Sequence, residues 1–552
     1  MKKSLNSIIF LVGLFSAGLT GCQKGSLLNN PNQASTSTVV PPTLILNRIT
    51  NELYNGGGVL DGVSGSVNEG PWNQLMRWNQ FFVSNYSYYW GSNTYTWSNT
   101  ATMYSVLKYV ELMEQQANAQ YGSTPNAYIA LAKFYRAYLF IWYSQRVGDI
   151  PMTQAGVSGI ATPKYDLQHD VYKNCLALLD TANTLMGALV AVPGNASSKV
   201  DATGDIFGLT YLQWQKVINS YKLRVLVSLS RRATDNADLN IPSQFANIVN
   251  NPTQYPIIAS NKDNWAYNYL ESPARNNYPL FPNYTPYVNY EFMSSTFLSL
   301  TTANQDPRTF IAASPAPNQI NAGKLGSDFT AYVGASINNT QPELTDSAGA
   351  YSYNNYLRYY GGAAGPNSSG ASCEPYVILG YAETCFNIAE AANRGWIPGV
   401  SGSSWYTQGI QASLGLYGLA DGVQIPISYP IFSPANLTNS LGNVTVSVTN
   451  FLNNPNVVYA GDNAQGLTQI LQQKYVAFWQ NSGWEAYYNW RRTGVPAFSQ
   501  GGSGIGTPNN MIPIRWLYPI DEQTSNTTNY NAAVQSQFGG AESVNSTMWL
   551  TK

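Results

Sequence analysis

Aromatic and uncharged polar side chains gather in residues 70–97, which hold ten aromatic residues in twenty-eight positions and one charged residue, Arg77. Trp and Tyr rings stack on the apolar faces of sugar rings, and the Asn, Gln, Ser and Thr residues between them can hydrogen-bond sugar hydroxyls. The stretch offers nothing for acid/base chemistry. It therefore predicts a surface that binds a neutral, hydroxyl-rich ligand.

Two interpretations of these side chains stay open. Spacings of three and four positions also suit the buried stripe of a helix, and five residues have them: Trp72, Leu75, Trp78, Phe82 and Tyr86. The residues after Ser84 lie among Gly, Ser and Asn, a composition that favours a loop. We expect the ligand contacts of this stretch from its later part, at Tyr86, Tyr88, Tyr89, Trp90 and Asn93.

A second aromatic cluster lies in residues 251–374, a section rich in Asn, Tyr, Pro, Ser and Gly with little periodicity. Segments of this length without regular structure are usually functional or form a small subdomain. The same aromatic and amide chemistry recurs there, although any one of these residues could also be an ordinary loop residue. The ligand-binding residues expected here are Trp265, Tyr267, Tyr269, Arg275, Asn276, Tyr278 and Tyr284.

Catalytic and metal-binding patterns are scarce. His169 is the only His, which argues against a His-based zinc site, a Ser-His-Asp triad and a Cys-His pair. A glycoside hydrolase needs two carboxylates about 5 to 10 Å apart, and the candidate pairs, Asp201 with Asp205 and Asp61 with Glu69, lie in no catalytic motif. Calcium at Asp201 and Asp205 is also disfavoured, because the residues that follow lack oxygen ligands. We expect no enzyme activity, no metal and no cofactor.

The charge balance narrows the ligand further. Charged residues make up 10% of the chain, the formal net charge is −1, and there is no basic run. Nucleic-acid binding needs a positive surface, so we expect no nucleic-acid partner.

The N-terminus has the pattern of an export signal. Lys2 and Lys3 precede an apolar run over residues 8–19, which is too short to span a bilayer comfortably and is typical of a secretory signal. The run ends in Leu-Thr-Gly-Cys, which resembles a bacterial lipobox, so Cys22 is the expected lipidation site. We predict a signal peptide at 1–21, a lipidated tether at 22–40 and a single domain at 41–552, with the loop-rich insert at 251–374.

The other cysteines give no disulfide framework. Cys175 and Cys385 lie in helical patterns and are expected to be buried free thiols. A bridge between Cys373 and Cys385 is conceivable, but nothing in the sequence requires one.

Helical hairpins are the elements that must position these residues. Apolar spacing predicts a first helix from Pro42 to before residue 56, and then four helix pairs. The pairs cover residues 97–120 with 124–147, 170–186 with 211–232, 375–393 with 403–417, and 466–479 with 484–492. Thr124 and Pro125 are the expected cap and first residue of their helix.

Motifs in a fixed order along the chain resemble the SusD/RagB family of nutrient-binding outer-membrane lipoproteins, and its second, SusD-like branch most closely. They are the lipobox at Cys22, Trp97 with Tyr104, Gly148-Asp149-Ile150-Pro151, residues 214–224, Asp306-Pro307-Arg308, residues 381–396, residues 485–494, and Ile512-Pro513-Ile514-Arg515 with Tyr518-Pro519. On this resemblance the motifs mark the fold and not the ligand site.

The resemblance implies a mostly α fold: four tetratricopeptide-like helix pairs forming a right-handed scaffold, with a loop-rich ligand-binding face. It also implies a cell-surface lipoprotein that captures nutrient for a SusC-like TonB-dependent transporter. Glycan-binding members place their aromatics in regions that correspond here to 86–93 and 265–287. Some members bind peptides, for which Arg275 or Arg77 could serve. Residues 23–26 lack the acidic side chains that often follow the lipidated Cys in surface-exported members.

Overall fold

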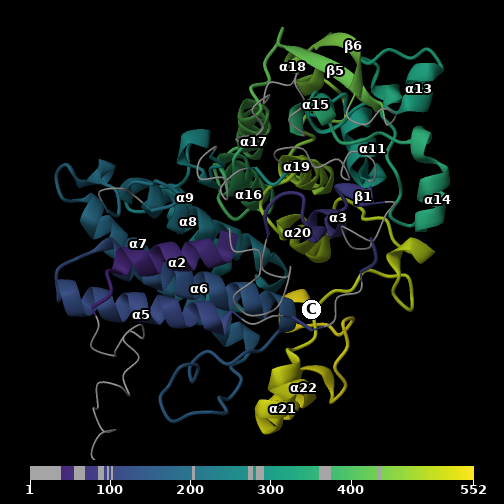
Figure 1. Ribbon diagram of the computed structural model, residues 1–552. Coiled ribbons are helices and arrows are strands. Elements are labelled where there is room, and N and C mark those ends of the chain that lie inside the picture. Colours follow the sequence, from purple (N-terminus) through teal and green to yellow (C-terminus); the bar gives the residue numbers. More distant parts are fainter. Residues whose placement is uncertain are drawn as a thin grey trace, which may run out of the picture. The chain divides into compact units, whose positions relative to one another are not determined.

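The computed structural model describes residues 39–54, 69–84, 93–95, 99–100, 103–201, 205–270, 278–280, 291–359, 374–431 and 437–552 (Figure 1). Contacts divide the chain into a first unit, Met1–Pro41, and a second, Pro42–Lys552, to which the description below refers. The predicted signal peptide and Cys22 lie outside the described residues. Within those ranges, no helix is both long and apolar enough to cross a membrane.

Long helices make up most of the second unit. They are α2 (Pro42–Tyr54), α5 (Tyr104–Tyr121), α6 (Ala127–Val147), α7 (Gln168–Val190), α8 (Tyr211–Ser228), α9 (Ile241–Asn250), α11 (Ser295–Ala303), α16 (Tyr381–Asn393), α17 (Gly402–Leu416), α19 (Ala464–Ala477), α20 (Glu485–Thr493) and α22 (Thr527–Phe538). The shorter helices are α3 (Gln74–Trp78), α12 (Thr309–Ala312), α13 (Pro317–Asn321), α14 (Gln341–Asp346), α15 (Tyr356–Tyr359), α18 (Val448–Leu452) and α21 (Ile520–Ser525).

Three of the four predicted helix pairs pack closely, whereas the fourth, α19 with α20, does not pack along its length, although Lys474 donates to Asn489 between the two helices. Helix α5 packs on α6, α7 on α8, and α16 on α17 (Figure 1). The pairs join into one scaffold because α6 also packs on α7, α8 on α16, and α16 on α19. Apolar and aromatic side chains such as Phe134, Tyr135 and Trp214 fill the space between them and are fully buried. The prediction of a mostly helical, tetratricopeptide-like fold is confirmed.

Several predicted helix boundaries are wrong. The helix expected over 97–120 begins at Tyr104 and ends at Tyr121. Thr124 is not the N-cap of α6. The N-cap is Asn126, whose side chain accepts a hydrogen bond from the amide of Ile129 at 3.2 Å. Asn is among the strongest N-cap residues, so it displaces the cap from the earlier Thr-Pro signal.

Three antiparallel two-stranded sheets are described. They pair β1 (Phe82–Ser84) with β3 (Glu291–Met293), β2 (Trp265–Tyr267) with β4 (Tyr376–Leu379), and β5 (Gln424–Ile431) with β6 (Leu437–Thr445). The helix predicted over 375–393 is therefore wrong in its first part. Residues 376–379 pair with β2, and the helix begins only after Gly380.

Residues 70–84 do not form the single helix stripe that their spacing allows. Helix α3 ends at Trp78, and Gln80 has a φ of 58°, a backbone conformation outside a right-handed helix. The chain then pairs as β1 with β3. Trp72, Leu75 and Phe82 are buried as that interpretation required, but they reach the core from three different local structures.

Cys175 and Cys385 are buried free thiols, as predicted. Burial raises the pKa of the Cys385 thiol to about 12. Both side chains therefore stay neutral and pack as small apolar groups.

Candidate functional site

Aromatic side chains from distant parts of the chain pack into one cluster, which we call the aromatic floor: Trp72, Tyr278, Tyr359, Tyr417 and Trp479. The indole Nε1 of Trp72 donates a hydrogen bond to the Tyr278 hydroxyl at 2.6 Å, and its ring lies 5.0 Å from that of Tyr359. The indole Nε1 of Trp479 donates to the Tyr359 hydroxyl at 3.0 Å. These contacts join sequence positions up to 407 residues apart into one packed surface.

The aromatic floor lies where several segments outside the described residues begin or end. Tyr278 follows 271–277, and Leu280, two residues on, precedes 281–290. Tyr359 precedes 360–373, whose other end, Glu374, forms an ion pair with Arg358. The insert segments that sequence analysis selected for their Arg, Asn and Tyr residues are therefore attached at one place.

The pairing of β1 with β3 brings the first aromatic stretch to the same place. Ser84 lies opposite Glu291 in the antiparallel register. Residues 85–92 continue from Ser84 and residues 281–290 lead into Glu291, so both segments attach at the same end of this sheet. Phe82 of β1 lies 5.9 Å from Trp72 between ring centroids, which connects the sheet to the aromatic floor.

Asn93 supports this arrangement and is not free to bind ligand. Its side-chain oxygen accepts from the amide of Ser84 at 2.8 Å, and its side-chain nitrogen donates to the carbonyl of Ser84 at 2.6 Å. The residue is 2% exposed. The prediction of Asn93 as a ligand-binding residue is corrected, because both ends of its amide are used inside the protein.

Trp265 and Tyr267 also belong to the core. Trp265 is fully buried, with its ring 5.4 Å from Phe134 and 6.0 Å from Trp214. Tyr267 is 6% exposed, since every residue of β2 is buried on both faces of its sheet. Their prediction as surface aromatics is wrong for this physical reason.

Of the predicted ligand residues, Tyr278 belongs to the aromatic floor and Tyr269 contacts it. The ring of Tyr269 is partly exposed and lies 5.1 Å from that of Tyr278. Tyr278 is only 3% exposed, so its ring lies beneath the surface and offers a ligand little area to contact. The remaining predicted ligand residues lie outside the described residues: Tyr86, Tyr88, Tyr89, Trp90, Arg275, Asn276 and Tyr284.

Sequence analysis missed Tyr359, Tyr417 and Trp479 as neighbours of this site. Tyr359 stands beside Tyr360, directly before a Gly-rich run, and that contrast in composition was the available signal. The cavity that these rings line has a volume of only about 10 Å³, close to the space of one water molecule. The aromatic floor is thus a packed support for the segments attached to it.

A buried ion pair lies beside the sheet that carries two of these segments. Arg77 Nη1 lies 2.8 Å from Glu291 Oε1, and both side chains are buried. Burial raises the pKa of Glu291 to about 7, although Arg77 acts against the shift. Arg77 therefore has a partner inside the protein and is not available for a peptide terminus, one of the roles considered for it above.

Among the carboxylates considered for hydrolysis, Asp205 and Glu69 have structural partners, and Asp61 lies outside the described residues. Asp205 accepts from the amides of Phe207 and Gly208 and, at 2.7 Å, from the indole of Trp214. Burial raises the pKa of Asp205 to about 6. Glu69 accepts from Trp142 at 2.6 Å and from Arg146 at 3.0 Å. In the described ranges, no group of His, Cys, Asp and Glu is placed to hold a metal ion.

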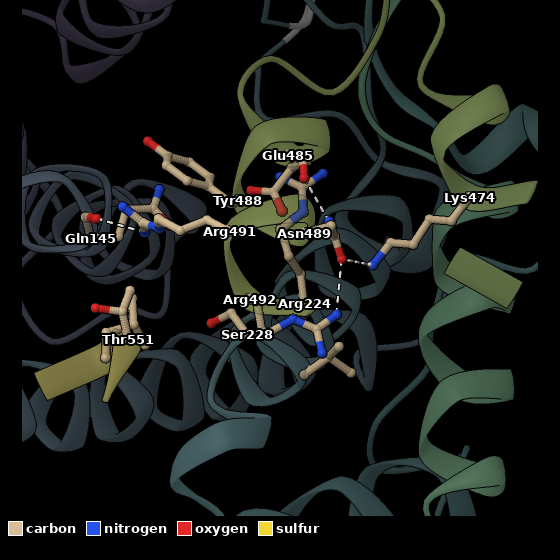
Figure 2. A pocket seen from close by; sticks show the side chains of 12 residues that line it. Gln145, Arg224, Ser228, Lys474, Glu485, Tyr488, Asn489, Arg491, Arg492 and Thr551 are labelled. Atoms are coloured by element: carbon tan, nitrogen blue, oxygen red, sulfur yellow. Dashed lines mark hydrogen bonds between the residues drawn. The ribbon is translucent and has the colours of Figure 1, made fainter. Parts of the chain in front are cut away.

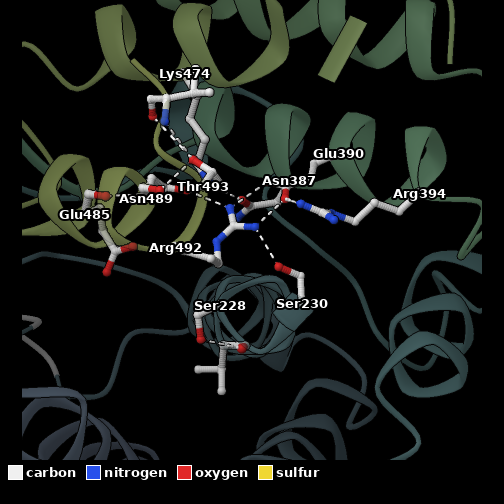
Figure 3. Close-up of polar contacts among 12 residues, drawn as sticks. Ser228, Ser230, Asn387, Glu390, Arg394, Lys474, Glu485, Asn489, Arg492 and Thr493 are labelled. Carbon is white, nitrogen blue, oxygen red and sulfur yellow. Dashed lines mark hydrogen bonds and ion pairs between the residues drawn. The ribbon is translucent and has the colours of Figure 1, made fainter. Parts of the chain in front are cut away.

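Charged side chains of α8, α16, α19 and α20 form a buried network. Arg224 donates to Glu383 at 2.6 Å. Lys474 donates to Asn489 at 3.1 Å, beside a cavity of about 20 Å³ (Figure 2). Arg492 bonds Glu390 and Ser230 (Figure 3). A cavity of this size has room for about one water molecule, and the side chains around it connect neighbouring helices.

The sequence was also compared with known proteins. The family model SusD-like_2, described as "Starch-binding associating with outer membrane", matches residues 31–519. A SusD homologue from Bacteroides fragilis is 25% identical with a TM-score of 0.75, covering 93% of this chain and 100% of its own. A second from that species is 27% identical with a TM-score of 0.71, covering 93% and 99%.

A chitin-binding protein shares the fold at 21% identity and a TM-score of 0.63, covering 93% of this chain and 100% of its own. A search of the curated proteins found no match.

Proposed function

This chain belongs to the SusD-like family, and we propose that it is a cell-surface lipoprotein that captures a neutral glycan and delivers it to a TonB-dependent transporter. The family is described as associating with the outer membrane, and its structurally characterised relatives include SusD homologues. The proposal assigns to this chain a ligand class, an anchor and a partner.

The observation that carries the proposal is the common attachment of the aromatic segments. Residues 85–92 hold Tyr86, Tyr88, Tyr89 and Trp90, and they attach beside residues 281–290, which hold Tyr284. Rings and amides from separate segments that share one attachment point can contact one ligand together. Neither segment contains Asp, Glu, Lys or Arg, so the side chains that they offer to a ligand are uncharged.

Neutral sugars suit such a surface better than ions do. Stacking removes the apolar faces of sugar and ring from water, while Asn, Ser and Tyr side chains satisfy the hydroxyls. A charged ligand would lose hydration without gaining an opposite charge in these two segments. The expected ligand is therefore an uncharged oligosaccharide.

The lipid anchor rests on Cys22 and the Leu-Thr-Gly sequence before it. Several acyl chains on one cysteine would anchor the mature chain stably, because a single chain holds only marginally. The expected partner is a SusC-like TonB-dependent barrel in the outer membrane, beneath this lipoprotein. Affinity purification of the tagged protein from native membranes should recover the barrel in near-stoichiometric amounts.

Binding of defined ligands by the full chain tests the proposal directly. Calorimetric titration should compare neutral oligosaccharides derived from starch, cellulose, xylan and chitin with an acidic oligogalacturonide and with peptides. The chitin series belongs in the set because a chitin-binding protein shares the fold. Binding of at least one neutral oligosaccharide is expected. Binding of peptides alone, or of the acidic sugar alone, would overturn the proposed ligand class.

A further inference from the structure

A second concave surface lies between helices α11 and α19, close to residues 496–499. It encloses about 590 Å³, within the range of about 300–1,000 Å³ that is usual for ligand sites. All of its lining residues lie in the described parts of the chain. We call this surface the polar groove.

The lining of the polar groove is uncharged. Helix α11 contributes Ser295 and Ser299, and helix α19 contributes Gln465, Thr468 and Gln472. The α19 residues are spaced by three and four, so they form one stripe along the helix. Two polar helix stripes therefore line the same groove, and no Asp, Glu, Lys, Arg or His lines it.

Part of this lining is fixed by bonds inside the protein. The side chain of Gln469 donates to the carbonyls of Asn456 and Val458, at 3.0 and 2.9 Å, and accepts from the amide of Ala460 at 2.8 Å. The hydroxyl of Thr296 donates to the side chain of Gln80 at 2.6 Å. These bonds hold the side chains of Gln469 and Thr296 in one orientation, so these two need not be ordered on binding.

Other lining side chains can still form hydrogen bonds with a ligand. Among the described residues, the side-chain amides of Gln465 and Gln472 and the hydroxyl of Ser299 have no hydrogen-bond partner. Each amide has two N–H donors and a carbonyl acceptor. The groove thus presents donors and acceptors side by side on a rigid support.

The core separates the polar groove from the aromatic floor. Phe297 lies on the buried side of α11, with its ring 5.8 Å from Phe81 and 5.1 Å from Trp479. Ser295 and Ser299 lie on the groove side of the same helix. The two surfaces are therefore different places on the protein.

We propose that the polar groove is a second binding site, which takes a neutral hydroxyl-rich chain such as an oligosaccharide. Vicinal hydroxyls both donate and accept, and a primary amide can do both to the same pair. Leu300 and Pro496 supply apolar contact for the C–H faces of a sugar. Without charge in the lining, an ionic ligand loses hydration and gains no countercharge.

This site adds to the proposed function and does not depend on where the aromatic segments bind. Two sites on one chain would let it hold a long or branched glycan at two points, which raises the overall affinity through effective concentration. The two sites can be tested separately because no residue is shared between them.

The test removes the two unpartnered amides with Gln465→Ala and Gln472→Ala in the full chain. Both positions lie on a helix surface where Ala is well tolerated, so the melting temperature should not fall. The control is Gln116→Ala with Gln120→Ala, two glutamines four residues apart on α5 that are far from the groove in sequence and bond each other. The probes are maltoheptaose, cellohexaose, xylohexaose and chitohexaose, measured by calorimetric titration.

At least one probe should lose affinity about tenfold or more with the groove variant and none with the control. Loss of affinity with Trp90→Ala but not with the groove variant would overturn the second site and leave the proposed function intact. Loss with the groove variant alone would support the groove and count against the aromatic segments. Binding of a neutral Ser/Asn peptide in the groove, with no probe bound there, would also overturn the proposal.

Discussion

The side-chain amide of Asn93 forms a two-bond contact with the backbone of Ser84, accepting from its amide at 2.8 Å and donating to its carbonyl at 2.6 Å. The eight residues between them therefore start and finish at one point of β1. Ser84 in turn lies opposite Glu291, where residues 281–290 end. An asparagine that composition suggested as a ligand group is instead the anchor of a predicted ligand-binding segment.

Replacing Asn93 by Ala should affect both stability and binding. The variant leaves the amide and carbonyl of Ser84 buried without this partner, which costs about 1–3 kcal/mol. Glycan affinity should fall as well, because residues 85–92 lose their anchor. Urea unfolding and calorimetric titration measure the two effects. The exposed Asn545→Ala is the control, and equal unfolding free energies for Asn93→Ala and wild type would contradict the assignment.

Trp90 and Trp265 form a matched test of surface against core. Stacking on a sugar contributes on the order of 1–2 kcal/mol at about 25 cal/mol per Å², so Trp90→Ala should weaken glycan binding roughly five- to thirty-fold. Its melting temperature should stay almost unchanged. Trp265→Ala should lower the unfolding free energy by about 3–5 kcal/mol, since it empties a fully buried site.

The same titrations and melting curves decide both assignments. Unchanged affinity with a lower melting temperature for Trp90→Ala would place that residue in the core. Full stability of Trp265→Ala would contradict the burial described here.

The helical part of the fold could be predicted from the sequence because its signal is local. Helices α6, α7, α8 and α16 bury side chains at helical spacing, and their predicted ends differ from the observed ones by up to four residues, except at the start of α16, where the difference is six. The β1–β3 and β2–β4 pairs could not be predicted this way. Their strands are three or four residues long, too short for an alternating pattern, and their partners lie about 110 to 210 residues away.

The candidate site could be predicted by region but not residue by residue. Trp265 and Tyr269 are four positions apart in the same aromatic, amide-rich segment, yet one is fully buried and the other is partly exposed. Composition cannot distinguish them, because a ring that stacks on a sugar and a ring that packs in a core have the same chemistry. Only the pairing of β2 with β4 decides which side chains are buried.

Changing Cys22 to Ala tests the proposed membrane anchor. The thiol at the end of Leu-Thr-Gly-Cys is the expected acyl acceptor, so the variant should appear as a soluble or unprocessed form. Fractionation of membranes, with mass measurement of the N-terminal peptide, checks this outcome. A Cys385→Ala variant, which alters a buried thiol, should stay with the membrane. A mature Cys22→Ala protein that remains membrane-bound would show that the anchor lies elsewhere.

The buried pair of Glu390 and Arg492 should make the stability of the fold fall with pH below about pH 4.5. Burial alone would raise the pKa of Glu390, but Arg492 and Arg394 outweigh it and hold the pKa at about 2. A carboxyl whose pKa is lower in the folded state than in the unfolded chain, near 4.5, stabilises the fold above pH 4.5. That contribution, about 3 kcal/mol, is lost as the pH falls from about 4.5 to 2.

Glu390→Gln should remove this pH dependence. The raised pKa of Glu291, about 7, has the opposite sign, since it lowers stability as the pH rises from about 4.5 to 7, so the two groups act in different pH windows. Urea unfolding at intervals from pH 2 to pH 7 measures both. The Glu390→Gln variant should be less stable at pH 7, because it leaves Arg492 buried without its countercharge. Its stability should also change less between pH 4.5 and pH 2 than that of the wild type. The exposed control Asp346→Asn should behave like the wild type. If the unfolding free energy of the variant falls below pH 4.5 as steeply as that of the wild type, Glu390 is not the group responsible.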